Sequence, residues 1–88
     1  MTYDVLLHRR AQEELDDLPE EAFRKLDPAI RDLAANPRPV GVKKLEDDLY
    51  RVRLGAWRVI YAIHDRERRV IVLRVARRSE RTYKRLPR

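Results

Sequence analysis

The feature that most constrains the fold is an alternation of apolar and charged residues between positions 50 and 83. Apolar side chains recur there at every second position, the period of a β-strand with one buried face. Two turn sequences, Gly55-Ala56 and residues 65–68, interrupt the alternation. The pattern predicts a three-stranded antiparallel meander with strands at residues 49–54, 57–64 and 69–77.

A short strand and a helix are predicted before the meander. Residues 3–7 form a strand-like run, and Ala11, Leu15 and Leu18 then fall on one stripe of a helix. Pro19 ends that helix because its backbone cannot continue the hydrogen bonding.

A second helix is expected directly after Pro19, which suits a first helical turn because its missing N–H group is not needed there. Apolar side chains continue at helical spacing as far as Ala34. Pro28 falls inside this helix, where a proline costs roughly 3 kcal/mol. We therefore expect a bend or a restart there, with Asp27 as a new N-cap.

Residues 36–48 contain prolines and charges without a clear period, so they are expected to form a loop that carries the basic pair Lys43 and Lys44. The predicted order is βααβββ. The fold class is then α+β: the N-terminal strand and the meander form one sheet packed on a helical hairpin, and residues 1–88 make a single domain.

Charge divides the chain into two unequal halves. Residues 1–48 hold 8 basic and 12 acidic side chains, net −4, whereas residues 49–88 hold 13 and 3, net +10. A positive field of this kind steers polyanions and raises their association rates. The C-terminal half is therefore expected to bind nucleic acid or an acidic protein.

The chain has no cysteine, and its first 20 residues are too charged for a signal peptide or a membrane span. His8 and His64 have no second ligand at metal spacing, and no glycine-rich phosphate loop is present. We expect a cytoplasmic protein that contacts no membrane and uses no metal or cofactor.

The predicted register of the first hairpin places arginines directly opposite each other on neighbouring strands. With Gly55-Ala56 as a two-residue loop, Arg53 lies directly opposite Arg58, and Arg51 opposite Ile60. The apolar face carries Val52, Leu54, Trp57, Val59 and Tyr61, and the opposite face carries Arg51, Arg53 and Arg58. Like charges placed directly opposite destabilise a sheet. Either solvent counterions or a bound phosphate, through bidentate guanidinium contacts, offsets the repulsion.

A second basic cluster follows the third strand of the meander: Arg77, Arg78, Arg81, Tyr83, Lys84 and Arg85. Because that strand ends at about Arg77, Arg78 is expected at the sheet edge, where it can converge on the hairpin arginines. Tyr83 beside it can stack on a base, worth about 1 to 3 kcal/mol in single-strand complexes.

Three segments together resemble the RelE/ParE superfamily of type II toxin–antitoxin toxins, nearer its RelE branch. They are NPRPVGVKKL at residues 36–45, YRVRLGAWRVIYAI at 50–63 and VLRVARRSERTY at 72–83. With the βααβββ order, the resemblance covers nearly the whole chain. It implies a basic toxin that enters the ribosomal A site and cuts mRNA, and that an acidic RelB-like antitoxin holds inactive in a hetero-oligomer.

In such toxins the ribose 2′-OH attacks the adjacent phosphorus without a metal. The positions of this chain that match the family's active site are Arg51, Arg53, Arg58, Arg78 and Tyr83. Six further basic residues are expected to contact RNA or the ribosome: Lys43, Lys44, Arg77, Arg81, Lys84 and Arg85. The best-studied branch of the family has lysines in place of Arg51 and Arg53, and its arginine-to-tyrosine spacing is one residue longer.

The arginines suit charge stabilisation better than proton transfer, because a guanidinium stays protonated at ordinary pH. We assign Arg53 and Arg58 to a phosphate clamp, Arg51 to backbone orientation and Arg78 to the leaving oxygen, with Tyr83 stacking or relaying a proton. Two alternatives stay open: a ParE-like inhibitor of DNA gyrase that acts by protein contact, and a basic binding module without activity.

Overall fold

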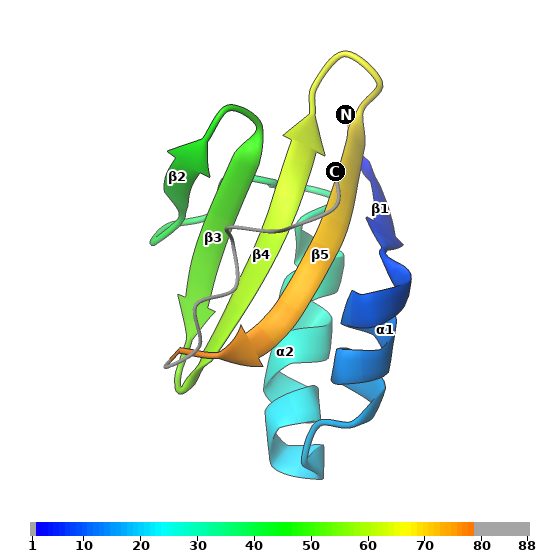
Figure 1. The fold of residues 1–88 in the computed structure, drawn as a ribbon. Helices are drawn as coiled ribbons and strands as arrows, with labels where there is room; N and C mark the ends of the chain where they lie inside the picture. Colours follow the sequence, from blue (N-terminus) through cyan, green and yellow to red (C-terminus); the bar gives the residue numbers. More distant parts are fainter. Residues whose placement is uncertain (1, 79–88) are drawn as a thin grey trace.

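The computed structural model describes residues 2–78, which form a sheet with two helices on one of its faces (Figure 1). The elements are β1 (Asp4–Leu7), α1 (Arg9–Asp16), α2 (Glu20–Asp32), β2 (Lys43–Glu46), β3 (Leu49–Leu54), β4 (Trp57–His64) and β5 (Arg69–Arg77). The five-stranded sheet has the order β1-β5-β4-β3-β2. Among the strands of residues 2–78, β1 and β5 run parallel and the other neighbouring pairs are antiparallel. The predicted α+β fold is confirmed.

The predicted loop at residues 36–48 is wrong in one part, because Lys43–Glu46 forms the edge strand β2. This strand is short and mostly charged, and Leu45 is its single apolar residue, so no apolar alternation marks it. Lysines on an edge strand discourage pairing with other chains, which accounts for the composition. The tight turn into β3 puts Asp47 at φ 43°, a backbone conformation that aspartate tolerates better than most residues.

The three strands of the meander have the predicted bounds. The β3–β4 register is also as predicted, with Arg53 opposite Arg58 and Leu54 opposite Trp57. The β4–β5 register, which the sequence left open, shifts by one residue after Ile60, where β5 bulges near Arg74.

The second helix runs without interruption from Glu20 to Asp32, so the expected restart at Pro28 is wrong. Asp27 pairs with Arg31 at 3.0 Å instead of capping a new helix. Leu26 and Ile30, on either side of the proline, are 0 % and 3 % exposed. Their burial against the sheet offsets the cost of the missing hydrogen bond.

The main core lies between the helices and the sheet, and a smaller cluster lies on the opposite sheet face. The larger core includes Leu15, Leu26, Ile30, Val52, Val59, Tyr61 and Val72. The smaller cluster contains Leu49, Ile60, Ala62 and Leu73. Since Ile60 is the cross-strand partner of Arg51, this cluster shares its face with the arginines.

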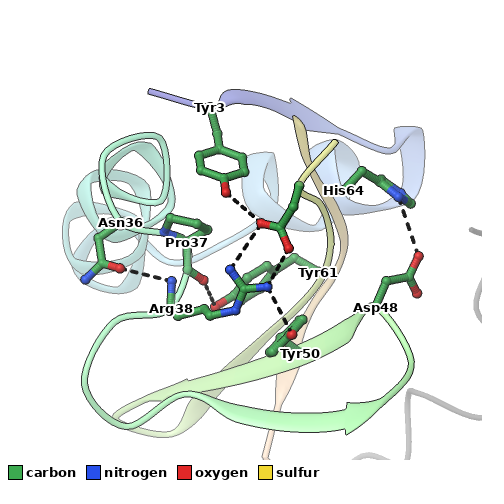
Figure 2. Close-up of polar contacts among 9 residues, drawn as sticks. Tyr3, Asn36, Pro37, Arg38, Asp48, Tyr50, Tyr61 and His64 are labelled. Carbon is green, nitrogen blue, oxygen red and sulfur yellow. Dashed lines mark hydrogen bonds and ion pairs between the residues drawn. The ribbon is translucent and has the colours of Figure 1, made fainter. Parts of the chain in front are cut away.

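A polar network holds together the end of the sheet where β4 turns into β5 (Figure 2). Arg38 donates to both carboxylate oxygens of Asp65, at 3.2 and 2.9 Å, and to the hydroxyl of Tyr50 at 3.2 Å. The Tyr3 hydroxyl donates to Asp65 at 2.6 Å, and the Tyr61 hydroxyl to the carbonyl of Pro37 at 2.8 Å. The hydrogen bonds from Arg38 and Tyr3 lower the pKa of Asp65 to about 2.

A second arginine–carboxylate pair joins α1 to β5. Arg74 donates from Nε and Nη2 to Glu14 at 2.7 to 3.0 Å, and the Val75 N–H donates to the same carboxylate at 2.9 Å. The Arg74 side chain is only 7 % exposed. The β5 bulge therefore turns a charged side chain toward α1, where a carboxylate satisfies it.

Candidate functional site

The β3–β4 hairpin carries the central residues of the candidate site. Arg51 and Arg53 alternate with the core residue Val52, and Arg58 lies across from Arg53, so all three arginines share the face opposite the helices. Gly55 makes the two-residue loop possible, since its φ of +62° is rarely adopted by other residues.

Arg78 is bound to this hairpin immediately after β5. Its backbone N–H donates to the Ala56 carbonyl at 3.0 Å, and its Nη1 donates to the Gly55 carbonyl at 3.5 Å. Arg58 Nη2 in turn donates to the Arg78 carbonyl at 2.7 Å. These contacts place two arginines that are 20 residues apart at one end of the sheet.

A hollow of about 460 Å³ lies at this end of the sheet. It is lined by Arg53, Ala56, Arg58, Arg77 and Arg78. No carboxylate or imidazole of residues 2–78 lines it. Arg51, Arg53 and Arg78 also make no ion pair with any residue in that range. The lining of the hollow is therefore strongly positive.

Arg51 is a half-buried arginine beside these charges. Burial, followed by the charges of Arg53, Arg58 and Arg78, lowers the pKa of its guanidinium below the ordinary value. Its Nε is buried and has no hydrogen-bond partner within residues 2–78. A bound anion would relieve the repulsion and supply the missing acceptor.

The chemistry open to this site is anion binding and charge stabilisation. Guanidinium groups remain protonated and offer planar sets of donors that match phosphate oxygens. Several of them around one phosphate stabilise the additional charge of a five-coordinate transition state.

The other predicted basic residues divide between the two faces. Lys43 lies across from Arg51 and joins the arginine face, whereas Lys44 lies across from Tyr50, a core residue on the helix side. Arg77 lines the arginine hollow, with its guanidinium carbon 4.7 Å from the centroid of the Trp57 ring. Four predicted residues lie outside the described range: Arg81, Tyr83, Lys84 and Arg85.

The histidines have structural contacts. His8 caps α1 by accepting from the Arg10 N–H, and His64 lies 3.5 Å from a carboxylate oxygen of Asp48. Among residues 2–78 no three His, Cys, Asp or Glu side chains are grouped so that they could hold a metal ion. In the same range no helix is both long and apolar enough to span a membrane.

Sequence reasoning missed the part of α2 that approaches the hairpin. The Lys25 ammonium lies 3.5 Å from where a side chain on Gly55 would begin. Lys25 and Glu21 both line a second cavity, between α2 and the hairpin, which is separate from the arginine hollow. The only local signal was the spacing of these two charges, four residues apart on one helix. It does not say what they face.

The chain matches known toxins over most of its length. A family model for the ParE toxin of the type II toxin–antitoxin system parDE matches residues 5–82. The RelE1 protein of Methanocaldococcus jannaschii is 36% identical over 84 residues, covering 90% of this chain and 93% of that protein. Toxin RelE of Mycobacterium tuberculosis is 37% identical over 81 residues, covering 88% and 82%.

The fold agrees with a solved toxin structure. In the crystal structure of the archaeal RelE–RelB complex from Pyrococcus horikoshii, the matching chain is 33% identical with a TM-score of 0.82. The match covers 92% of this chain and all of that one. The chain belongs to the RelE/ParE superfamily of type II toxin–antitoxin toxins.

Proposed function

We propose that this toxin is a ribosome-dependent endoribonuclease that cuts mRNA in the ribosomal A site. The observation that carries the proposal is the gathering of Arg53, Arg58, Arg77 and Arg78 around one hollow, with Arg51 beside them. A protein that acted only through apolar contacts would have no need to hold these like charges together.

The reaction needs no metal. The 2′-oxygen of one ribose attacks the adjacent phosphorus while the bond from phosphorus to the 5′-oxygen of the next nucleotide breaks. The 2′-hydroxyl loses its proton and the leaving 5′-oxygen gains one, so the products are a 2′,3′-cyclic phosphate and a 5′-hydroxyl end. Negative charge accumulates on the phosphoryl oxygens between these events.

The arginines act on that charge. Arg53 and Arg58 clamp the phosphate from the two hairpin strands, Arg51 orients the backbone, and Arg78 stabilises the leaving oxygen. Tyr83 stacks on a base or relays a proton. Since none of the arginines accepts a proton at neutral pH, the 2′-hydroxyl gives its proton to another group.

The ribosome supplies the positioning that a shallow hollow lacks. Correct placement of two reacting groups is worth several kcal/mol of the barrier, and an mRNA held in the A site is already placed. The free protein is therefore a slow nuclease. Lys43 and the basic C-terminal residues contact RNA around the cut, and Lys44, on the other face, contacts the ribosome.

An acidic antitoxin holds the toxin inactive. The similar Pyrococcus horikoshii toxin was crystallised with RelB, which supports a RelB-like partner here. An acidic segment laid over the arginine face would neutralise the +10 half of the chain and block the hollow.

The test is to map mRNA 5′ ends after brief induction and to repeat the cutting with purified ribosomes, message and toxin. We expect cuts within translated codons, 5′-hydroxyl ends, and no cuts in a message without a start codon. Cutting that ignored translation, or 5′-phosphate ends, would contradict the proposal.

A second candidate is inhibition of DNA gyrase by protein contact, and the match to the ParE family model favours it. It is tested in parallel by adding the purified toxin to a DNA supercoiling assay. Blocked supercoiling by the purified toxin, together with intact messages in cells that express it, would decide for this alternative.

A further inference from the structure

A second cavity lies on the other side of the β3–β4 turn, between the hairpin and α2. Its volume is about 270 Å³, and its lining includes Glu21 and Lys25 of α2 together with Trp57 and Arg77 of the sheet. The arginine hollow and this cavity share Ala56 and Arg77 among their lining residues. The two spaces are therefore adjacent across the end of the sheet.

One wall of the cavity is a stacking surface. Arg77 and Trp57 are cross-strand partners, and the guanidinium carbon lies 4.7 Å from the indole centroid. Arg77 is exposed and Trp57 half-buried, so the pair presents a flat, positively charged surface to solvent. Nucleobases stack readily on guanidinium and indole planes.

The opposite wall carries one donor and one acceptor. Glu21 and Lys25 are four residues apart in the orientation that favours a helical ion pair, yet they form none, whereas Glu20 and Arg24 on the same helix pair at 2.7 Å. Lys25 instead extends to within reach of Gly55. A carboxylate and an ammonium left available beside a stacking surface match the polar edge of a base.

We propose that this cavity binds a base of the mRNA next to the cut phosphate, and that Glu21 and Lys25 select which base it accepts. The proposal rests on the proposed ribonuclease function and names the determinant of its codon preference. A nucleotide whose phosphate enters the arginine hollow has its base within reach of the neighbouring cavity.

The first test measures codon preference. Purified full-length toxin cuts translating messages that present all codons, and Lys25→Ala and Glu21→Gln are compared with Arg24→Ala. Arg24 is a matched control, since it is exposed on the same helix and lies outside the cavity lining. We expect Lys25→Ala and Glu21→Gln to change the relative cutting of codons by about tenfold, and Arg24→Ala to leave it unchanged.

The second test does not depend on activity. Trp57 is the only tryptophan of the chain, so its fluorescence reports stacking directly. A short single-stranded RNA is expected to quench it, and the same RNA with abasic sites is expected to bind without quenching. Lys25→Ala should weaken the quenching of the intact RNA, and Arg24→Ala should not.

The outcomes separate this inference from the proposed function. If Lys25→Ala and Glu21→Gln cut at the wild-type rate and with the wild-type codon preference, the inference would be overturned and the proposed nuclease function would be unaffected. RNA binding without a change in Trp57 fluorescence would do the same. Absence of cutting by the wild type would contradict the nuclease itself. If the two substitutions weakened only antitoxin binding, the cavity would be a protein-docking site.

Discussion

The arginines at the two ends of the sheet have different kinds of partner. At the end where β4 turns into β5, Arg38 makes two hydrogen bonds to Asp65 and lies 5.1 Å from the centroid of the Tyr50 ring. At the β3–β4 hairpin end, Arg58 and Arg78 donate to backbone carbonyls and line a hollow without a carboxylate from residues 2–78. The first arrangement joins segments of the chain through an arginine–carboxylate pair, whereas the second gathers several arginines around one hollow.

The largest expected effect is at the hairpin end. Arg58→Ala and Arg78→Ala should each lower the cutting rate about a hundredfold to a thousandfold, because one charge contact to the transition state is typically worth about 2.7 to 4 kcal/mol. Single-turnover cutting on ribosomes measures the rate. The free energy of unfolding should fall much less, because the hydrogen bonds that these side chains make to backbone carbonyls are each worth about 1 kcal/mol.

Arg66→Ala is the control for this prediction, because Arg66 is an exposed arginine in the turn at the other end of the sheet. It removes the same charge and should leave the rate within about twofold. Wild-type rates in both Arg58→Ala and Arg78→Ala would show that the hollow is not the active site.

The next effect concerns an arginine that is paired internally. Glu14→Gln should lower the free energy of unfolding by about 3 kcal/mol, because it leaves the buried Arg74 guanidinium without its carboxylate. Urea unfolding measures it. The neighbouring Glu13→Gln is the control, since Glu13 is 64 % exposed in its pair with Arg9 and should contribute little. Equal losses in both variants would contradict the difference between a buried and an exposed ion pair.

Antitoxin binding should depend on salt. An acidic partner over the arginine face associates under electrostatic steering, so its association rate constant should fall about tenfold or more between low and high ionic strength. Stopped-flow mixing with the cognate antitoxin measures it, and Arg53→Ala should reduce the salt dependence. Tight association that ignored ionic strength would rule out the electrostatic component.

The smallest effect is a pH dependence at the Asp65 network. The pKa of Asp65 is held at about 2, below the usual value near 3.9, so the stabilisation is present above about pH 4 and is lost as the pH falls toward 2. The contribution should be less than about 1 kcal/mol, because the paired side chains are 41 % and 56 % exposed. Urea unfolding between pH 6 and pH 2 should show a shallower decline in Asp65→Asn. An unchanged decline would mean that other carboxylates dominate.

Local periodicity was enough for the faces of the meander. A two-residue loop between alternating strands leaves one register that buries Val52 and Val59, and that register puts Arg53 against Arg58. The arginine face was therefore predictable without knowledge of the rest of the chain.

Elements without a local pattern were not predictable. β2 forms because an edge of β3 is available to pair with, and α2 continues through Pro28 because Leu26 and Ile30 are buried on the sheet. In both cases long-range packing outweighed the preference of the segment itself.

The sequence by itself determined which residues share a strand face and how the charge divides between the two halves, since both follow from neighbours along the chain. Only the tertiary structure decided that Arg78 joins Arg58, that Arg74 turns to Glu14, and that Lys25 approaches Gly55. These partners are 20 to 60 residues apart. Contacts at that separation depend on how whole elements pack, which no local pattern of residues records.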